Sequence, residues 1–242
     1  MTTKSLALGA AMVLAACAAA ADLPAQSRPE TATDISQTVR KAEVLAARQS
    51  WDAAIAAYRE AVAASPKDAA LQNRLGICYQ RAGDTKQARK AYRKAIELRT
   101  DYAEAWNNLA TLEHSQGRFA QAVADYAKAI ELKPSDAVFQ KNLGVAWLAR
   151  GDVGKALAAW NEAYRIDPAS LDSEGVPVPA AGLSLARQYY LYAKLLAARG
   201  ESEKAIGYLA RARTQGFNDF GKVERDKDFA SVITDPRYAA LK

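Results

Sequence analysis

Two consecutive stretches of sequence decide the fold. Residues 69–102 read AALQNRLGICYQRAGDTKQARKAYRKAIELRTDY, and residues 103–136 read AEAWNNLATLEHSQGRFAQAVADYAKAIELKPSD. They align without a gap, with small residues at positions 8, 20 and 27, glycine at position 15 and tyrosine at position 24 of each stretch. Because self-similarity at a fixed period is the signature of stacked structural units, the chain is predicted to be a repeat array.

The same 34-residue period extends to residues 35–68 and 137–170. The recurring small, aromatic and proline positions are Ala42, Gly76, Ala110, Gly144; Ala54, Ala88, Ala122, Ala156; Tyr58, Tyr92, Tyr126, Trp160; Ala61, Ala95, Ala129, Ala163; and Pro66, Pro134, Pro168. Small residues let two helices approach closely, and the aromatic ring fills the remaining volume. Glycine at position 15 ends the first helix of each unit, and the proline near its end terminates the second.

These four blocks resemble the tetratricopeptide repeat, whose period is 34 residues. The resemblance implies an all-α, right-handed α-solenoid of about five helix-turn-helix repeats with a C-terminal helical cap. Repeats 1 to 4 occupy residues 35–68, 69–102, 103–136 and 137–170, and an insertion occupies 171–185. A degenerate fifth repeat spans 186–219, where Gly200, Ala205, Leu209 and Ala212 keep the pattern, and the cap spans 220–242.

The insertion and the tail break the period in different ways. Within residues 171–185, the run Val176–Pro179 should be extended, because proline is incompatible with a helix interior. The insertion is either a surface loop between repeats or a flap over the groove that offers an edge to a partner. The tail is expected to cover the apolar face of the last repeat, with Phe217, Phe220, Val223, Phe229, Val232, Tyr238 and Leu241.

The first residues have the pattern of a secretory signal. Lys4 precedes an apolar run that ends near residue 16, which predicts a signal peptide over 1–16. Leu14-Ala15-Ala16-Cys17 resembles the lipobox of bacterial lipoproteins, which implies lipidation of Cys17 and a membrane anchor. The alternative is ordinary cleavage between residues 21 and 22, after three alanines. Residues 17–34 then form a flexible tether.

This N-terminus predicts an exported protein on the periplasmic side of the envelope, as an outer-membrane lipoprotein. The alternative localisation is soluble periplasmic or secreted. Nucleic acid is not an expected partner, since the aromatic residues occupy core positions rather than stacking platforms.

Composition excludes several kinds of chemistry. The chain has 242 residues and a formal net charge of +6, but only two cysteines and one histidine. A Cys/His zinc site and a dense disulfide framework are therefore excluded. Cys78 occupies a packed helix position and should be a buried, inert thiol. His114 has no nucleophile or acidic partner nearby in the sequence, so we expect it to be a polar surface residue. For the protein as a whole we expect no catalytic residue, metal, cofactor or small-molecule substrate, and hence no enzyme.

The first helices of the repeats should line a concave groove that binds a protein or peptide. Candidate groove residues are Asn73, Arg74, Asn107, Asn108, His114, Lys141 and Asn142. An Asn amide both donates and accepts, so it can pair with a peptide backbone whatever the side chain. The other interpretation is that these amides bond neighbouring helices. Glu113 replaces the usual aromatic at position 11, where we expect a more open site.

A second candidate surface is basic. Residues 69–102 carry eight Lys/Arg against three acids. Five of these cations recur at helical spacing and form one face of the second helix: Lys86, Arg89, Lys90, Arg93 and Lys94. This face is either simply solvated or contacts anionic head groups or an acidic partner. The first functional hypothesis is thus a non-catalytic envelope scaffold that works through the groove, and the alternative is an accessory subunit of an envelope enzyme or transport complex that works through the basic face.

Overall fold

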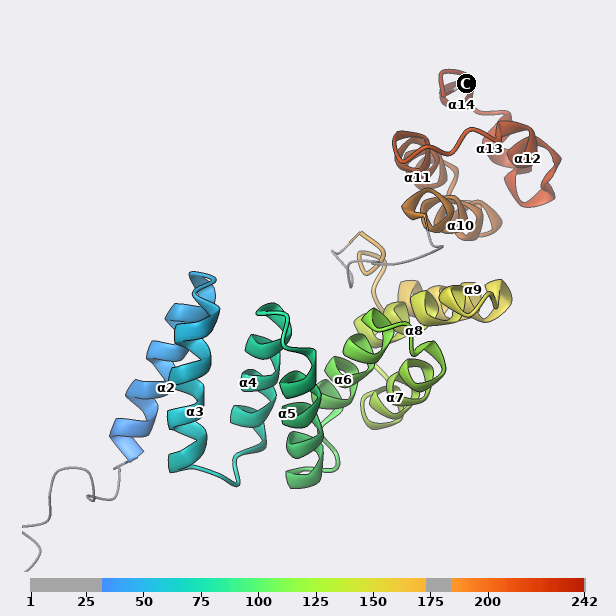
Figure 1. Ribbon diagram of the computed structural model, residues 1–242. Helices are drawn as coiled ribbons and strands as arrows, with labels where there is room; N and C mark the ends of the chain where they lie inside the picture. The colour runs from blue at the N-terminus through green and yellow to red at the C-terminus, as the bar shows by residue number, and fades with distance from the viewer. Residues whose placement is uncertain (1–31, 173–183, 242) are drawn as a thin grey trace, which may run out of the picture. The chain divides into compact units, whose positions relative to one another are not determined.

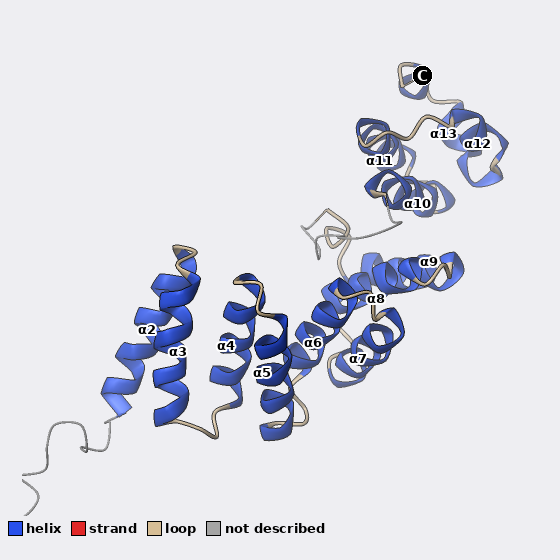
Figure 2. Ribbon diagram, viewed as in Figure 1, coloured by secondary structure: helices blue, strands red, loops and turns tan. Residues whose placement is uncertain are grey.

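The computed structural model describes residues 32–172 and 184–241, and within these ranges the chain is all-α (Figure 2). The described chain falls into two compact units that divide after Pro66. The all-α fold class predicted from the period is confirmed, since successive helices pair as helix-turn-helix units (Figure 1).

The first unit contains one helix pair, α2 (Ala32–Ala47) and α3 (Trp51–Ala64). The small residues of the period meet between the two helices, and Ala42, Ala54 and Ala61 are fully buried. Helix α2 begins three residues before the predicted start of repeat 1. The C-terminal end of the predicted tether is therefore helical, and residues 17–31 lie outside the described ranges.

The second unit continues with three regular pairs. These are α4 (Ala69–Arg81) with α5 (Thr85–Leu98), α6 (Ala103–Ser115) with α7 (Phe119–Leu132), and α8 (Ala137–Ala149) with α9 (Val153–Ile166). The period explains their close packing. A Cβ atom added to Gly144 would lie 2.3 Å from Nε1 of Trp160, and one added to Gly76 would lie 2.6 Å from Cε1 of Tyr92.

The turn residues and several of the N-caps follow the repeat positions. The turn glycines have positive φ angles, such as 85° at Gly83, a conformation that glycine adopts at little cost. Repeat 1 has Gln49 there instead, at a φ of 58°. Asp68 caps α4 by accepting hydrogen bonds from two backbone N–H groups. Asp101 does not do the same for α6, because the N-cap of that helix is the next residue, Tyr102, which makes no side-chain hydrogen bond there.

The C-terminal part of the second unit contains a fourth pair, α10 (Leu185–Ala198) with α11 (Ser202–Thr214). The helices α12 (Phe220–Arg225), α13 (Ala230–Ile233) and α14 (Pro236–Ala239) follow, with a 3-10 turn at Lys227–Phe229. All seven apolar tail residues belong to one cluster with α10 and α11. The side chains of Val223, Phe229 and Val232 are fully buried. The tail therefore covers the last helix pair.

The predicted insertion is described only at its ends. Leu171 is buried in the cluster of the last pair, and Asp172 accepts a hydrogen bond of 2.8 Å from the hydroxyl of Tyr208 on α11. Residues 173–183, with the predicted extended run at Val176–Pro179, lie outside the described ranges. None of the helices in the described ranges is long and apolar enough to cross a membrane.

Candidate functional site

A ladder of asparagine side chains joins the first helices of successive repeats. The Nδ2 of Asn108 on α6 donates to Oδ1 of Asn73 on α4, at 3.0 Å. The Nδ2 of Asn142 on α8 donates to Oδ1 of Asn107 on α6, also at 3.0 Å. Each bond joins position 6 of one repeat to position 5 of the repeat before it. The four amides therefore bond neighbouring helices, as the second interpretation of the sequence expects.

Burial narrows the set of predicted groove residues. Arg74, Asn107 and Asn108 are partly exposed. Asn73, Lys141 and Asn142 are buried, and desolvation lowers the pKa of the Lys141 ammonium. These three side chains occupy the seams between helices, where they are shielded from solvent. A groove ligand would therefore contact the partly exposed residues of the set, Arg74, Asn107 and Asn108.

The expectation that His114 is a polar surface residue is wrong. It lies in the last turn of α6 and is 1% exposed. Its ring packs against Phe119 at the start of α7, with ring centroids 5.2 Å apart. Neither ring nitrogen has a hydrogen-bond partner in the described ranges. Burial disfavours the imidazolium and lowers the pKa of His114.

Glu113 also differs from expectation, because it is buried rather than open, at 2% exposure. Its Oε1 accepts a hydrogen bond of 2.8 Å from Nε of Arg89 on α5. Its Oε2 accepts from Nε of Arg118, the residue just before α7. The space that an aromatic ring would fill is thus occupied by two guanidinium groups. The signal for this pair was in the sequence, since Arg118 lies five residues after Glu113.

The basic face of α5 is only partly free. Lys86, Lys90 and Arg93 are exposed. Lys94 forms a 3.0 Å ion pair with Glu97 on the same helix. Arg89 is turned toward α6, where Glu113 and Gln116 accept its hydrogen bonds. Three of the five predicted cations thus present their charge to solvent, whereas Arg89 joins the two repeats.

Asp125 on α7 is a buried acid that the sequence reasoning missed. Its Oδ1 accepts a hydrogen bond of 2.8 Å from Gln121. Burial raises its pKa, as does the charge of Glu113, while the Gln121 hydrogen bond and Arg93 lower it. Other repeats have alanine at this position, at Ala91 and Ala159, so the alignment contained the signal.

The remaining chemistry-bearing groups form no reaction centre in the described ranges. Cys78 is a buried free thiol, as predicted, and desolvation raises its pKa. No grouping of three or more His, Cys, Asp or Glu side chains that could hold a metal ion occurs between residues 32 and 172 or between 184 and 241.

Family models confirm the repeat assignment. One tetratricopeptide repeat model matches residues 34–101 and 69–135, and a second matches residues 115–170. The chain belongs to the tetratricopeptide repeat family. The matched range runs without a gap through the four regular repeats that the period defines. The comparison with curated proteins gave no match.

Solved structures share the fold. A crystal structure of MamA is 21% identical, covers 76% of this chain and 96% of its own, and has a TM-score of 0.53. The Pseudomonas aeruginosa pilF structure is 19% identical, covers 86% of this chain and 88% of its own, and has a TM-score of 0.59. YrrB, described as a TPR protein with an unusual peptide-binding site, is 18% identical, covers 76% of this chain and 87% of its own, and has a TM-score of 0.51.

Proposed function

We propose that this protein is a non-catalytic scaffold that binds a peptide or protein segment along the first helices of its repeats. The observation that carries the proposal is that the asparagine ladder leaves some hydrogen-bonding groups of its side chains unused. Asn107 uses its Oδ1 for Asn142 and Asn108 uses its Nδ2 for Asn73. Both side chains are partly exposed, and no described residue takes up the Asn107 donors or the Asn108 acceptor. A peptide unit needs one donor and one acceptor of this kind.

Membership of the tetratricopeptide repeat family supports the proposal, because proteins of this family bind proteins or peptides. The solved structure of YrrB is described by its peptide-binding site. Stacked helices also preorganise a binding surface, so that ordering the array adds little to the cost of association. The proposal includes no catalytic step.

Replacement of Asn107 by Asp tests this groove. The aspartate keeps an oxygen for the Nδ2 of Asn142 but removes the free Nδ2 donors. The matched control is Asn218→Asp, the same exchange at an exposed residue in the turn before α12. Partners are captured by photo-crosslinking from native extracts and identified by mass spectrometry. A partner lost from Asn107→Asp and retained by Asn218→Asp is expected; retention by both variants would contradict groove binding.

We propose further that the scaffold acts on the periplasmic side of the envelope and is anchored through Cys17. The support is the sequence of residues 1–17, with Lys4, the apolar run and the lipobox-like tetrapeptide. Mass spectrometry of the mature N-terminus tests this. A diacylglyceryl-modified Cys17 is expected, whereas an unmodified chain that begins at Asp22 would support the soluble periplasmic alternative.

The second candidate function is that of an accessory subunit whose contact with its complex is the basic face of α5. The exposure of Lys86, Lys90 and Arg93 favours it. Replacing all three by glutamate should then abolish capture of the complex. The matched control is glutamate at Arg187, Arg213 and Lys227, three exposed cations of the last helix pair and the tail. Equal capture by both triple variants would remove this candidate.

A further inference from the structure

Three positions of the repeat pattern change their chemistry together where repeat 2 meets repeat 3. At position 11 of repeat 3 the residue is Glu113, whereas the neighbouring repeats have Tyr79 and Trp147. At position 16 of repeat 3 it is Arg118, whereas the neighbours have Asp84 and Asp152. At position 21 of repeat 2 it is Arg89, whereas the later repeats have Val123 and Leu157. The structure brings Glu113, Arg118 and Arg89 into direct contact.

The equivalent contact between later repeats is apolar. Val123 of α7 and Trp147 of α8 belong to one hydrophobic cluster. Leu157 of α9 belongs with Leu196 of α10 to another. A buried ion pair often contributes no more to stability than apolar side chains of similar volume. Stacking alone therefore does not require the charges at the junction of α5 and α6.

The geometry at this junction fixes two guanidinium groups side by side. The two carboxylate oxygens of Glu113 accept from Nε of Arg89 and Nε of Arg118, one each. The Oε1 of Gln116 accepts from the NH2 atoms of the same two arginines, at 3.2 and 3.1 Å. Four hydrogen bonds thus hold two side chains that would otherwise have many rotamers.

The charges at this junction do not cancel. Arg89 and Arg118 share the carboxylate of Glu113, and the buried Asp125 interacts with both Glu113 and Arg93. Three guanidinium groups against two carboxylates, 3 − 2, leave one net positive charge. The NH1 atoms of Arg89 and Arg118 have no partner in the described ranges, and their side chains are 22% and 45% exposed. Lys90, which is exposed, adds further charge on the same helix. Each guanidinium keeps its NH1 group and one N–H of NH2 for a further acceptor, and two such neighbouring N–H groups match the two oxygens of a carboxylate.

We propose that Arg89 and Arg118, held in place by Glu113 and Gln116, form an oxyanion-binding site for the carboxylates of an acidic segment of a partner protein. The proposal rests on the second candidate function and names the chemistry of the partner. It is separate from the asparagine ladder, which uses other residues of the first helices.

The observations favour an acidic protein segment over an anionic membrane. The exposed cations from Lys86 to Arg93 extend the site along α5 for about 10 Å, the length of about three residues of extended chain. A helix that binds a membrane surface needs an apolar face to bury among the lipids. The apolar face of α5, with Ala88, Ala91 and Tyr92, is buried within the repeats.

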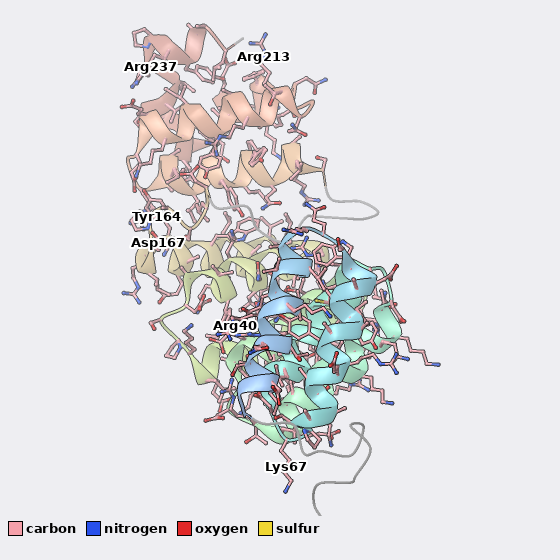
Figure 3. The ribbon with its side chains drawn as sticks, turned by 90° about the vertical axis from the view of Figure 1, so that its left-hand side faces the viewer. Arg40, Lys67, Tyr164, Asp167, Arg213 and Arg237 are labelled. Carbon is pink, nitrogen blue, oxygen red and sulfur yellow. The ribbon has the colours of Figure 1, made fainter. Side chains whose placement is uncertain are left out.

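The first test measures binding of a fluorescein-labelled octaglutamate peptide to the full chain by anisotropy. Arg118→Lys and Arg89→Lys keep the charge but remove the guanidinium fork. Each should weaken binding about tenfold, the range expected for a lost charge-assisted hydrogen bond. The control is Arg213→Lys on α11, an exposed arginine labelled in Figure 3, and it should bind as wild type does. Wild-type affinity in Arg118→Lys would overturn the proposal.

The second test separates preorganisation from net charge. Glu113→Gln makes the junction more positive, so charge alone predicts tighter binding of octaglutamate. The proposal predicts weaker binding, because the arginines lose the carboxylate that fixes them. If circular dichroism shows that Glu113→Gln does not fold, Gln116→Ala is measured in its place, since Gln116 is exposed. Its loss leaves the NH2 atoms of both arginines unfixed, so octaglutamate binding should weaken. Tighter binding by Glu113→Gln, or unchanged binding by Gln116→Ala, would overturn the proposal.

Two further arms identify the source of the anion and separate this site from the groove. Vesicles of anionic phosphatidylglycerol that bind the chain when octaglutamate does not would overturn the assignment to a protein segment. Asn107→Asp should leave octaglutamate affinity unchanged. If Asn107→Asp loses its captured partner but still binds octaglutamate, both sites are supported. If the wild-type chain captures a partner through the groove but does not bind octaglutamate, the arginine site alone is rejected.

Discussion

Single residues control how closely the paired helices approach. Gly144 faces the indole of Trp160, and an added Cβ would lie within 2.3 Å of it. Gly207 on α11 has the same helical context but faces open space. The two positions therefore separate the packing role of glycine from its cost to helix stability.

Gly144→Ala should lower the free energy of unfolding by about 1–3 kcal/mol, because the core must shift to admit one methyl group. Gly207→Ala should raise it by about 0.5–1 kcal/mol, the usual gain from removing a helical glycine. Urea unfolding followed by circular dichroism measures both. A loss in Gly207→Ala as large as that in Gly144→Ala would show that the close approach to Trp160 is not the cause.

The buried imidazole of His114 predicts acid sensitivity. Burial lowers its folded-state pKa below the unfolded value of 6.5. As the pH falls below 6.5, the unfolded chain takes up a proton that the folded chain does not. The free energy of unfolding therefore decreases, by up to about 1.4 kcal/mol for each unit by which the pKa is lowered.

Urea unfolding at a series of pH values between about 7.5 and 5.5 checks this prediction. The comparison is with His114→Leu, which lacks the titrating ring. The pKa of Asp125 is raised, so its protonation acts in the opposite direction and is common to both chains. Parallel pH profiles of the two chains would show that His114 does not contribute.

At the scale of elements, some second helices begin with a side-chain cap, as α5 does at Asp84. Asp152 caps α9 by accepting a hydrogen bond of 3.0 Å from the backbone N–H of Lys155. Ser50 occupies the same repeat position before α3 but makes no such bond. These two residues are a matched pair for testing the contribution of the cap.

Asp152→Ala should lower the free energy of unfolding by about 1 kcal/mol, because one helical N–H group loses its acceptor. Ser50→Ala should change it much less. Thermal unfolding measured by calorimetry compares the two variants with wild type. An equal effect of both substitutions would mean that the hydrogen bond to Lys155 does not stabilise α9.

Elements also show what the sequence could predict. Alignment of equivalent positions located the helix pairs and the turn glycines, since each depends on residues within one repeat. The alignment did not predict the burial of Glu113 and His114. Their environments come from Arg89, Arg118 and Phe119, which occupy non-equivalent positions. The asparagine bonds likewise join residues 35 apart, one more than the period.

At the scale of the whole second unit, contacts run mainly between successive elements. Each helix from α4 to α9 packs against the next helix in the chain, and α12 to α14 pack around the last pair. Stability in such an array is local, with each repeat supported by its neighbours. Damage at the C-terminal end should therefore spread only a short way along the chain.

Phe229→Ala tests this locality. Phe229 is fully buried in the cluster of the last pair, so its truncation should cost about 3–5 kcal/mol within that cluster. Hydrogen exchange should accelerate in α10 and α11, while α6 and α7 keep their protection. Uniform acceleration across residues 67–172 would show that the unit unfolds as one cooperative block.

The burial of Cys78 has a practical consequence for kinetics. Its thiol lies inside the α4 and α5 pair and is closed to solvent. A disulfide reagent can reach it only when that pair opens, because the thiol must be accessible and ionised to react. In a chain carrying Cys17→Ser, Cys78 is the single remaining thiol. The rate of its modification then reports how often repeat 2 opens, with a probe that the protein already contains.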